Sequence, residues 1–146
     1  MKIIERDLLK IHEGIICHQV NLLGVAGGLA QDIFQLYPEA FKKYKIACKD
    51  KSLKLGFIQP ILISKTPSYL VLANLAGQEK VNTHGRQTDY DALSSCFQKV
   101  NLLSNKLNLP LYLPYQIGCG LGGGDWGIVS GLIKTHCPDA TICKIN

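Results

Sequence analysis

The sequence lacks both a long apolar run and a recognisable secretion signal. No apolar stretch among its 146 residues approaches the ~20 residues that a membrane-spanning helix needs. The opening stretch, MKIIERDLLK, is charged and contains no signal-peptide core. These two absences lead us to expect a cytoplasmic protein with no membrane partner.

Cysteine pairs at metal-binding or redox spacing are also missing. None of the six cysteines forms a C-x-x-C pair, and most lie in apolar segments, where a reduced cysteine behaves as a small buried hydrophobe. We therefore favour reduced core cysteines over a disulfide framework. His136, Cys137 and Cys143 are too sparse for the three or four ligands of a zinc site. We expect neither a metal nor a cofactor.

The proportions of apolar and charged residues are those of an ordinary globular domain. Apolar residues make up 47% of the chain and charged residues 18%, which predicts one domain over residues 1–146. Much of the net charge of +5 comes from lysines in one segment, which are Lys42, Lys43, Lys45, Lys49, Lys51 and Lys54. A solvated helix face explains this run more simply than a nucleic-acid-binding surface does. A mildly basic surface also attracts small polyanions.

Apolar periodicity predicts strands that alternate with helices through the second half of the chain. The expected strands cover residues 1–7, 14–20, 55–63, 69–74, 111–115 and 140–145. The expected helices cover residues 27–48, 89–107 and 125–135, and Pro38 kinks or interrupts the first of them. Residues 77–87 are polar and are expected to form a loop. This order predicts an α/β sandwich around a central sheet.

A strand, a glycine-rich turn and a helix follow one another twice in the sequence. The first turn carries GVAGG at residues 24–28, and the second carries IGCGLGGG at residues 117–124. Such a turn presents unpaired backbone N–H groups and a partial positive charge at the start of a helix, where phosphate binds well. A pair of tight turns with no ligand is the plain alternative. Two such turns at strand ends favour a phosphate-bearing ligand.

The second turn contains the spacing G-x-G-x-x-G at Gly118, Gly120 and Gly123. A dinucleotide-binding fold would need an acidic residue about 20 residues later on a following strand. Only 23 residues follow Gly123, too few for the rest of such a fold. A Walker A loop is excluded as well, because no Lys-Ser or Lys-Thr pair follows the glycines.

Four segments together resemble the macrodomain, an ADP-ribose-binding family. They are RDLL at 6–9, CHQVN at 17–21 with GVAGGLA at 24–30, YLVLANL at 69–75 with TDY at 88–90, and LPYQIGCGL at 113–121. The resemblance implies a three-layer α/β/α sandwich with a central mixed sheet. It also implies that ADP-ribose or a derivative is the partner, and that an ADP-ribosylated protein or nucleic acid can carry it.

The resemblance further implies a set of binding residues. Asp7 and Leu8 belong to the segment that reads the adenine amino group. Asn21, Gly27, Gly28 and Leu29 belong to the loop along the distal ribose and the diphosphate. The phosphates are then wrapped by the second loop, with Ile117, Gly118, Cys119, Gly120, Leu121, Gly122 and Gly123.

The branch that this chain resembles contains ADP-ribose 1''-phosphate phosphatases and terminal ADP-ribose glycohydrolases. The glycohydrolases place a catalytic acid directly after the leucine of the second loop, where this chain has Gly122. They also use a lysine on or just after the middle strand, and residues 74–77 offer none. The phosphatase-like members have a histidine at the position of His18, which is retained.

Two residues are candidates for catalysis, each with a plain alternative. His18 at a strand end is either a base or nucleophile, or a core histidine that only supports the loop. Asp125 is either an acid or the cap of the last helix, and we favour the cap. Trp126 is expected to anchor the core, and His84, Arg86 and Asp89 are expected on a surface loop or a lid.

Three functions follow from these residues. The first is an enzyme that hydrolyses an ADP-ribose derivative, with ADP-ribose 1''-phosphate as the leading substrate. The second is a module that binds ADP-ribose without turnover. The third is a hydrolase that removes ADP-ribose from a modified protein or nucleobase.

Overall fold

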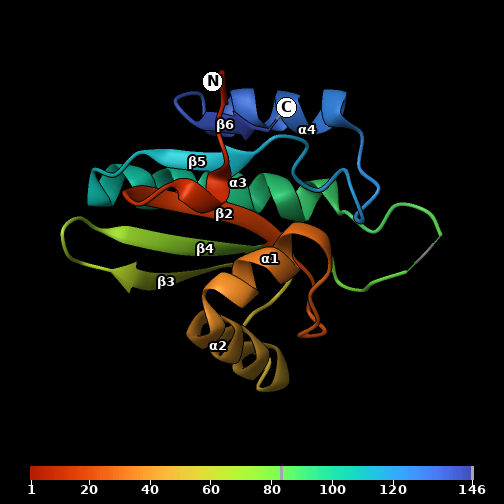
Figure 1. The fold of residues 1–146 in the computed structure, drawn as a ribbon. Helices are drawn as coiled ribbons and strands as arrows, with labels where there is room; N and C mark the ends of the chain where they lie inside the picture. The colour runs from red at the N-terminus through yellow and green to blue at the C-terminus, as the bar shows by residue number, and fades with distance from the viewer. Residues whose placement is uncertain (83, 146) are drawn as a thin grey trace.

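The computed structural model describes residues 1–82 and 84–145, and in these ranges six strands form one mixed sheet (Figure 1). Their order across the sheet is β1-β6-β5-β2-β4-β3. Neighbouring strands are parallel except β3, which pairs antiparallel with β4. The strands are β1 (Lys2–Glu5), β2 (Gly14–Val20), β3 (Ile58–Ser64), β4 (Leu70–Ala76), β5 (Leu111–Pro114) and β6 (Thr141–Lys144).

Four α-helices and one short 3-10 helix accompany this sheet in the described part of the chain. They are η1 (Leu8–Lys10), α1 (Gly28–Leu36), α2 (Pro38–Lys49), α3 (Tyr90–Leu107) and α4 (Trp126–His136). Helices α1 and α2 pack on one face of the sheet, and α3 and α4 pack on the other (Figure 1). The predicted three-layer α/β/α sandwich with a mixed sheet is therefore confirmed.

Strand β2 lies in the middle of the sheet and is covered on both faces. Successive side chains of a strand point to opposite faces, so Ile15 and Cys17 join the core with α3 and α4, while Ile16 joins the core with α1 and α2. This explains the nearly continuous apolar run GIICHQV. The polar residues in this run, His18 and Gln19, consequently stand on opposite faces near the carboxyl end of the strand.

The predicted helix over residues 27–48 is two helices. Helix α1 ends at Leu36, and Pro38 occupies the first turn of α2, where its missing N–H costs nothing. The interruption predicted at Pro38 is therefore confirmed. Strand β3 begins at Ile58, later than the predicted residue 55, because Gly56 adopts a positive φ of 84° in the turn before it.

All six cysteines are free thiols, and Cys17, Cys96, Cys137 and Cys143 are buried. Burial raises the pKa of the Cys96 thiol to about 12, so it stays protonated at neutral pH. In the described ranges no helix is long and apolar enough to cross a membrane. Among the same residues, no three His, Cys, Asp or Glu side chains are grouped to hold a metal ion.

Candidate functional site

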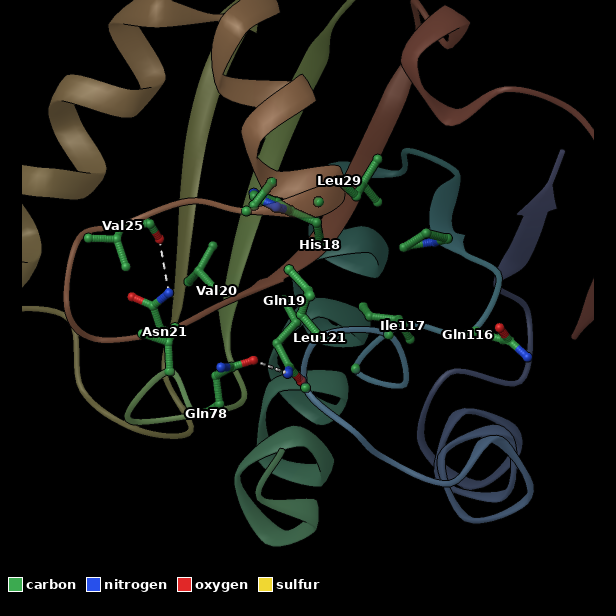
Figure 2. Close-up of a pocket in the computed structure, with 18 of the residues that line it drawn as sticks. His18, Gln19, Val20, Asn21, Val25, Leu29, Gln78, Gln116, Ile117 and Leu121 are labelled. Atoms are coloured by element: carbon green, nitrogen blue, oxygen red, sulfur yellow. Dashed lines mark hydrogen bonds between the residues drawn. The ribbon is translucent and has the colours of Figure 1, made fainter. Parts of the chain in front are cut away.

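A cleft of about 490 Å³ opens at the carboxyl ends of β2 and β5. Two loops form its walls, as Figure 2 shows: a first loop of residues 21–27 after β2, and a second loop of residues 115–124 after β5. The carboxyl ends of parallel strands are where α/β sheets commonly bind ligands, because the connecting loops diverge there. The cleft thus contains both glycine turns that the sequence singled out.

The first wall exposes an uncapped helix start. Gly27 is the N-cap of α1 and provides no side-chain hydrogen bond, and Gly28 follows with a positive φ of 56°. A Cβ at Gly27 would lie 3.0 Å from a methyl carbon of Leu121, so a side chain here would press on the opposite loop. The first-turn N–H groups of α1 therefore remain available to an anion in the cleft.

The second wall exposes three consecutive backbone N–H groups. Within the described residues, the N–H groups of Gly120, Leu121 and Gly122 donate to no protein acceptor. The loop is closed instead by hydrogen bonds from its other amides, such as Gly124 N–H to the Gly118 carbonyl oxygen at 2.9 Å. Successive free N–H groups of this kind form a concave anion site.

His18 lines the cleft but is almost completely buried, at 1% exposure. Its Nε2 lies 2.5 Å from Oδ1 of Asn74, and its ring packs edge-on against Phe34. Burial lowers the pKa of His18 to about 4, and the Asn74 contact opposes this shift. The imidazole is therefore neutral at pH 7. Within the described residues, its Nδ1 has no hydrogen-bond partner.

The side chain of Asn21 shapes the first loop. Its Oδ1 accepts hydrogen bonds from the Leu23 N–H and the Tyr44 hydroxyl. Its Nδ2 donates to the Val25 carbonyl oxygen (Figure 2). Burial raises the pKa of Tyr44 far above its ordinary value, so this hydroxyl stays a donor. Asn21 lines the cleft with its polar atoms already used by the protein.

The carboxylates of Asp125 and Asp7 both cap helices. Asp125 accepts from the Ile128 N–H at 3.2 Å at the start of α4, so the predicted cap is confirmed. Asp7 accepts from the Leu9 N–H at 2.9 Å at the start of η1. Neither residue is among those that line the cleft.

The structure brings most of the predicted site residues together. Those that line the cleft are His18, Asn21, Gly27, Gly28, Leu29, Ile117, Gly118, Gly120, Leu121 and Gly122. Those outside its lining are Asp7, Leu8, Cys119, Gly123 and Asp125. Leu8 is instead a buried core residue at 3% exposure.

Other lining residues were not predicted from the sequence. They include Gln19, Val25, Gln78, Val81, Tyr115 and Gln116. The sequence could have indicated Gln19, because a polar side chain within a buried apolar strand is typical of a functional or hydrogen-bonding position. None of the residues lining the cleft is an Asp, Glu, Lys or Arg in the part of the chain that the structure describes. Backbone dipoles and neutral amides therefore supply the polarity of the cleft.

Arg86, Asp89 and Trp126 all contact other residues of the protein. The Arg86 guanidinium lies 4.2 Å from the ring centre of Tyr90 and donates to the Thr88 carbonyl oxygen. Asp89 caps α3 through the Ala92 N–H. Trp126 is only partly buried and packs edge-on against Tyr115, with ring centres 5.0 Å apart.

No known protein-family model matches this sequence. A curated relative, an uncharacterized 17.5 kDa protein of Enterobacteria phage T4, is 34% identical over 64 residues. That match spans 42% of this chain and 41% of the relative's length.

Solved structures that resemble the whole chain include two with informative names. The macrodomain of Mycobacterium tuberculosis DarG is 20% identical with a TM-score of 0.80, and the match covers 99% of this chain and 95% of that one. Thermosipho africanus DarTG, solved in complex with ADP-ribose, is 19% identical with a TM-score of 0.82, and the match covers 99% of this chain and 41% of that one. The element order, the mixed sheet and these likenesses together establish that the chain has the macrodomain fold.

Proposed function

We propose that the cleft binds ADP-ribose and holds its diphosphate with backbone N–H groups. The observation that carries this proposal is the pair of unused amide sets in one cleft. One set belongs to the uncapped start of α1, and the other is the run Gly120, Leu121 and Gly122. Both bind anions through oriented dipoles, so a diphosphate needs no cationic side chain there.

The size and the lining of the cleft support a nucleotide-sized ligand. Its volume of about 490 Å³ lies within the range of small-molecule sites. Apolar side chains such as Leu29, Ile117 and Leu121 surround the polar groups, which is typical of such sites. The likeness to Thermosipho africanus DarTG, which was solved with ADP-ribose, adds support at the level of the fold.

Asp7 is our candidate for recognition of the adenine amino group. Its Oδ1 accepts the Leu9 N–H, which leaves Oδ2 as a second acceptor. The short helix η1 that it caps contacts β5, the strand that leads into the second loop. The adenine would then extend beyond the lining of the cleft toward η1.

Calorimetric titration with ADP-ribose tests the proposed binding. We expect a one-to-one complex, and weaker binding of adenosine, which has no diphosphate for the amides to hold. Substituting Asp7→Ala should weaken both ligands by a similar factor. The proposed function is wrong if the wild-type chain gives no heat with ADP-ribose and no ADP-ribose-dependent shift in its melting temperature.

A second candidate function is hydrolysis of ADP-ribose 1''-phosphate, and the state of His18 favours it. Nδ2 of Asn74 donates to Oε1 of Gln59 at 3.0 Å, so the oxygen of Asn74 faces His18. His18 must then carry its proton on Nε2, which leaves the lone pair on Nδ1. A neutral imidazole with a free lone pair can accept a proton at pH 7, and its lowered pKa of about 4 makes it a weak base.

This reaction requires water to reach Nδ1 of His18, which is buried in the ligand-free chain. Nδ1 then takes a proton from that water, and the water oxygen bonds to phosphorus. The bond between phosphorus and the sugar oxygen breaks, and that oxygen takes up a proton to give ADP-ribose and inorganic phosphate. The Asp125 carboxylate caps α4 outside the lining of the cleft, so the proposal depends on His18.

Phosphate release from ADP-ribose 1''-phosphate tests the second function. We expect the wild-type chain to release phosphate and His18→Ala to lose most of that rate while still binding ADP-ribose. A wild-type chain that binds ADP-ribose but releases no phosphate would instead be a reader module. Equal rates in both chains would remove His18 from the mechanism.

A further inference from the structure

Three polar side chains form a connected cluster behind the second loop, which we call the latch: Gln19, Gln78 and Thr88. Nε2 of Gln19 donates to Oε1 of Gln78 and to Oγ1 of Thr88, both at 2.8 Å, and Figure 2 shows the first of these bonds. Gln78 and Thr88 are also paired through their backbones by an isolated β-bridge. The latch therefore joins β2 to the two ends of the connection between β4 and α3.

The latch holds the second loop by its carbonyl oxygens. The Thr88 hydroxyl donates to the Gly118 carbonyl oxygen at 2.6 Å. The N–H groups of Gln87 and Thr88 both donate to the Gly122 carbonyl oxygen, at 2.8 and 3.0 Å. These bonds restrain the loop at both ends of the segment that carries the free N–H groups of Gly120, Leu121 and Gly122.

The contact between the latch and the loop leaves no room for a side chain. A Cβ at Gly122 would lie 2.8 Å from the Gly118 carbonyl oxygen and 2.9 Å from Nε2 of Gln19, and would collide with the Thr88 hydroxyl. Real Cβ atoms do not make such contacts with backbone. The resemblance aligns position 122 with the catalytic acid of the glycohydrolases, and in this chain the latch occupies the space that an acidic side chain would need there.

The same connection also contacts the first loop. The Leu22 N–H donates to the Glu79 carbonyl oxygen at 3.1 Å, directly after Gln78. The end of the connection near Gln78 thus bonds to the first loop, and the end at Thr88 bonds to the second loop. The distance between the helix start of α1 and the free N–H groups of the second loop depends on these bonds.

We propose that Thr88 is a positioning residue for diphosphate recognition: its hydroxyl holds the second loop so that the Gly120–Gly122 amides are free for an anion. This inference rests on the proposed ADP-ribose binding. Thr88 itself contacts no ligand in this proposal, because it acts through the Gly118 carbonyl oxygen. The proposal also assigns the second loop to binding, because the latch excludes an acidic side chain at position 122.

The first test uses the ligand-free chain and the variants Thr88→Val and Thr88→Ser. Thr88→Val keeps the shape and removes the hydroxyl, so the Gly118 carbonyl keeps only the Gly124 N–H and the Gln19 amide keeps only Gln78. We expect NMR to show shifted resonances and faster exchange for the amides of residues 118–122 in Thr88→Val and near-wild-type behaviour in Thr88→Ser. Unchanged amides in Thr88→Val overturn the proposal whether or not ADP-ribose binds.

The second test measures ADP-ribose affinity in the same variants. We expect Thr88→Val to lower the affinity about tenfold, and Thr88→Ser to restore most of it. Thr141→Val is the matched control, since Thr141 is another buried threonine, on β6 and outside the lining of the cleft. Equal affinity in Thr88→Val and wild type, or an equal loss in Thr141→Val, overturns the positioning role. A wild-type chain that ignores ADP-ribose refutes the proposed function instead.

Discussion

At the scale of single residues, the sequence identified the candidates but not the partners that decide their chemistry. His18 and Asp125 stood out in the sequence as possible acids or bases. Only the fold brings Asn74 to His18, whereas the cap that Asp125 forms on α4 was predicted from the sequence. Asn74 lies 56 residues from His18, whereas Ile128, whose N–H binds the Asp125 carboxylate, lies 3 residues from Asp125. Only the second contact is local enough to be read from the sequence.

The buried neutral His18 makes stability depend on pH. In the unfolded chain its pKa is near the ordinary 6.5, and in the folded chain it is about 4. Between these values the unfolded chain binds more protons, so the free energy of unfolding falls as pH drops through this window. We expect His18 to contribute a loss of up to about 3 kcal/mol by pH 4.

Urea unfolding of wild type and His18→Gln between pH 4 and 8 measures this contribution. The free energy of unfolding of wild type should fall relative to that of His18→Gln as pH drops from 6.5 to 4, because glutamine cannot be protonated. Parallel curves would mean that His18 titrates normally in the folded protein.

Gly122 is expected to tolerate no side chain. We expect Gly122→Ala to destabilise the fold by about 1–3 kcal/mol through overpacking against the latch. Gly120→Ala is the matched control, because its Cβ would meet nothing within 4 Å. Thermal melting of both variants checks the prediction, and equal melting temperatures would contradict the close packing at Gly122.

At the scale of elements, the helix starts of α1 and α4 differ in a way that matters for function. α4 begins with the Asp125 cap, whereas α1 begins with Gly27 and no side-chain cap. A carboxylate at the start of α1 would compete with an anionic ligand for the same N–H groups. The helix that lines the cleft, α1, is thus the one whose first N–H groups are left free for a ligand.

The cap on α4 predicts a structural rather than a catalytic phenotype. Asp125→Ala should lower the free energy of unfolding by about 1 kcal/mol and leave ADP-ribose affinity near wild type. Asp89→Ala, which removes the equivalent cap of α3, should behave alike. If Asp125→Ala abolishes phosphate release at saturating substrate while Asp89→Ala does not, Asp125 has a role in catalysis.

At the scale of the whole molecule, ligand binding should stabilise the fold, since the cleft is built from loops on both sides of the sheet centre. A ligand that binds only the folded state at 100 times its Kd adds about 2.7 kcal/mol to the free energy of unfolding. Thermal melting against ADP-ribose concentration measures this effect. A melting temperature that is independent of ADP-ribose contradicts binding in the cleft.

The sequence by itself determined the α/β sandwich and both glycine loops, because these depend on local periodicity and on the backbone freedom of glycine. Pro38 likewise marked the break between α1 and α2 in advance. Tertiary structure alone decided that His18 is buried against Asn74, that the cleft contains no ionised carboxylate or ammonium group among the described residues, and that Thr88 holds Gly118 and Gly122. Most of these contacts join residues far apart in the chain, and their burial and distances exist only once the sheet has assembled.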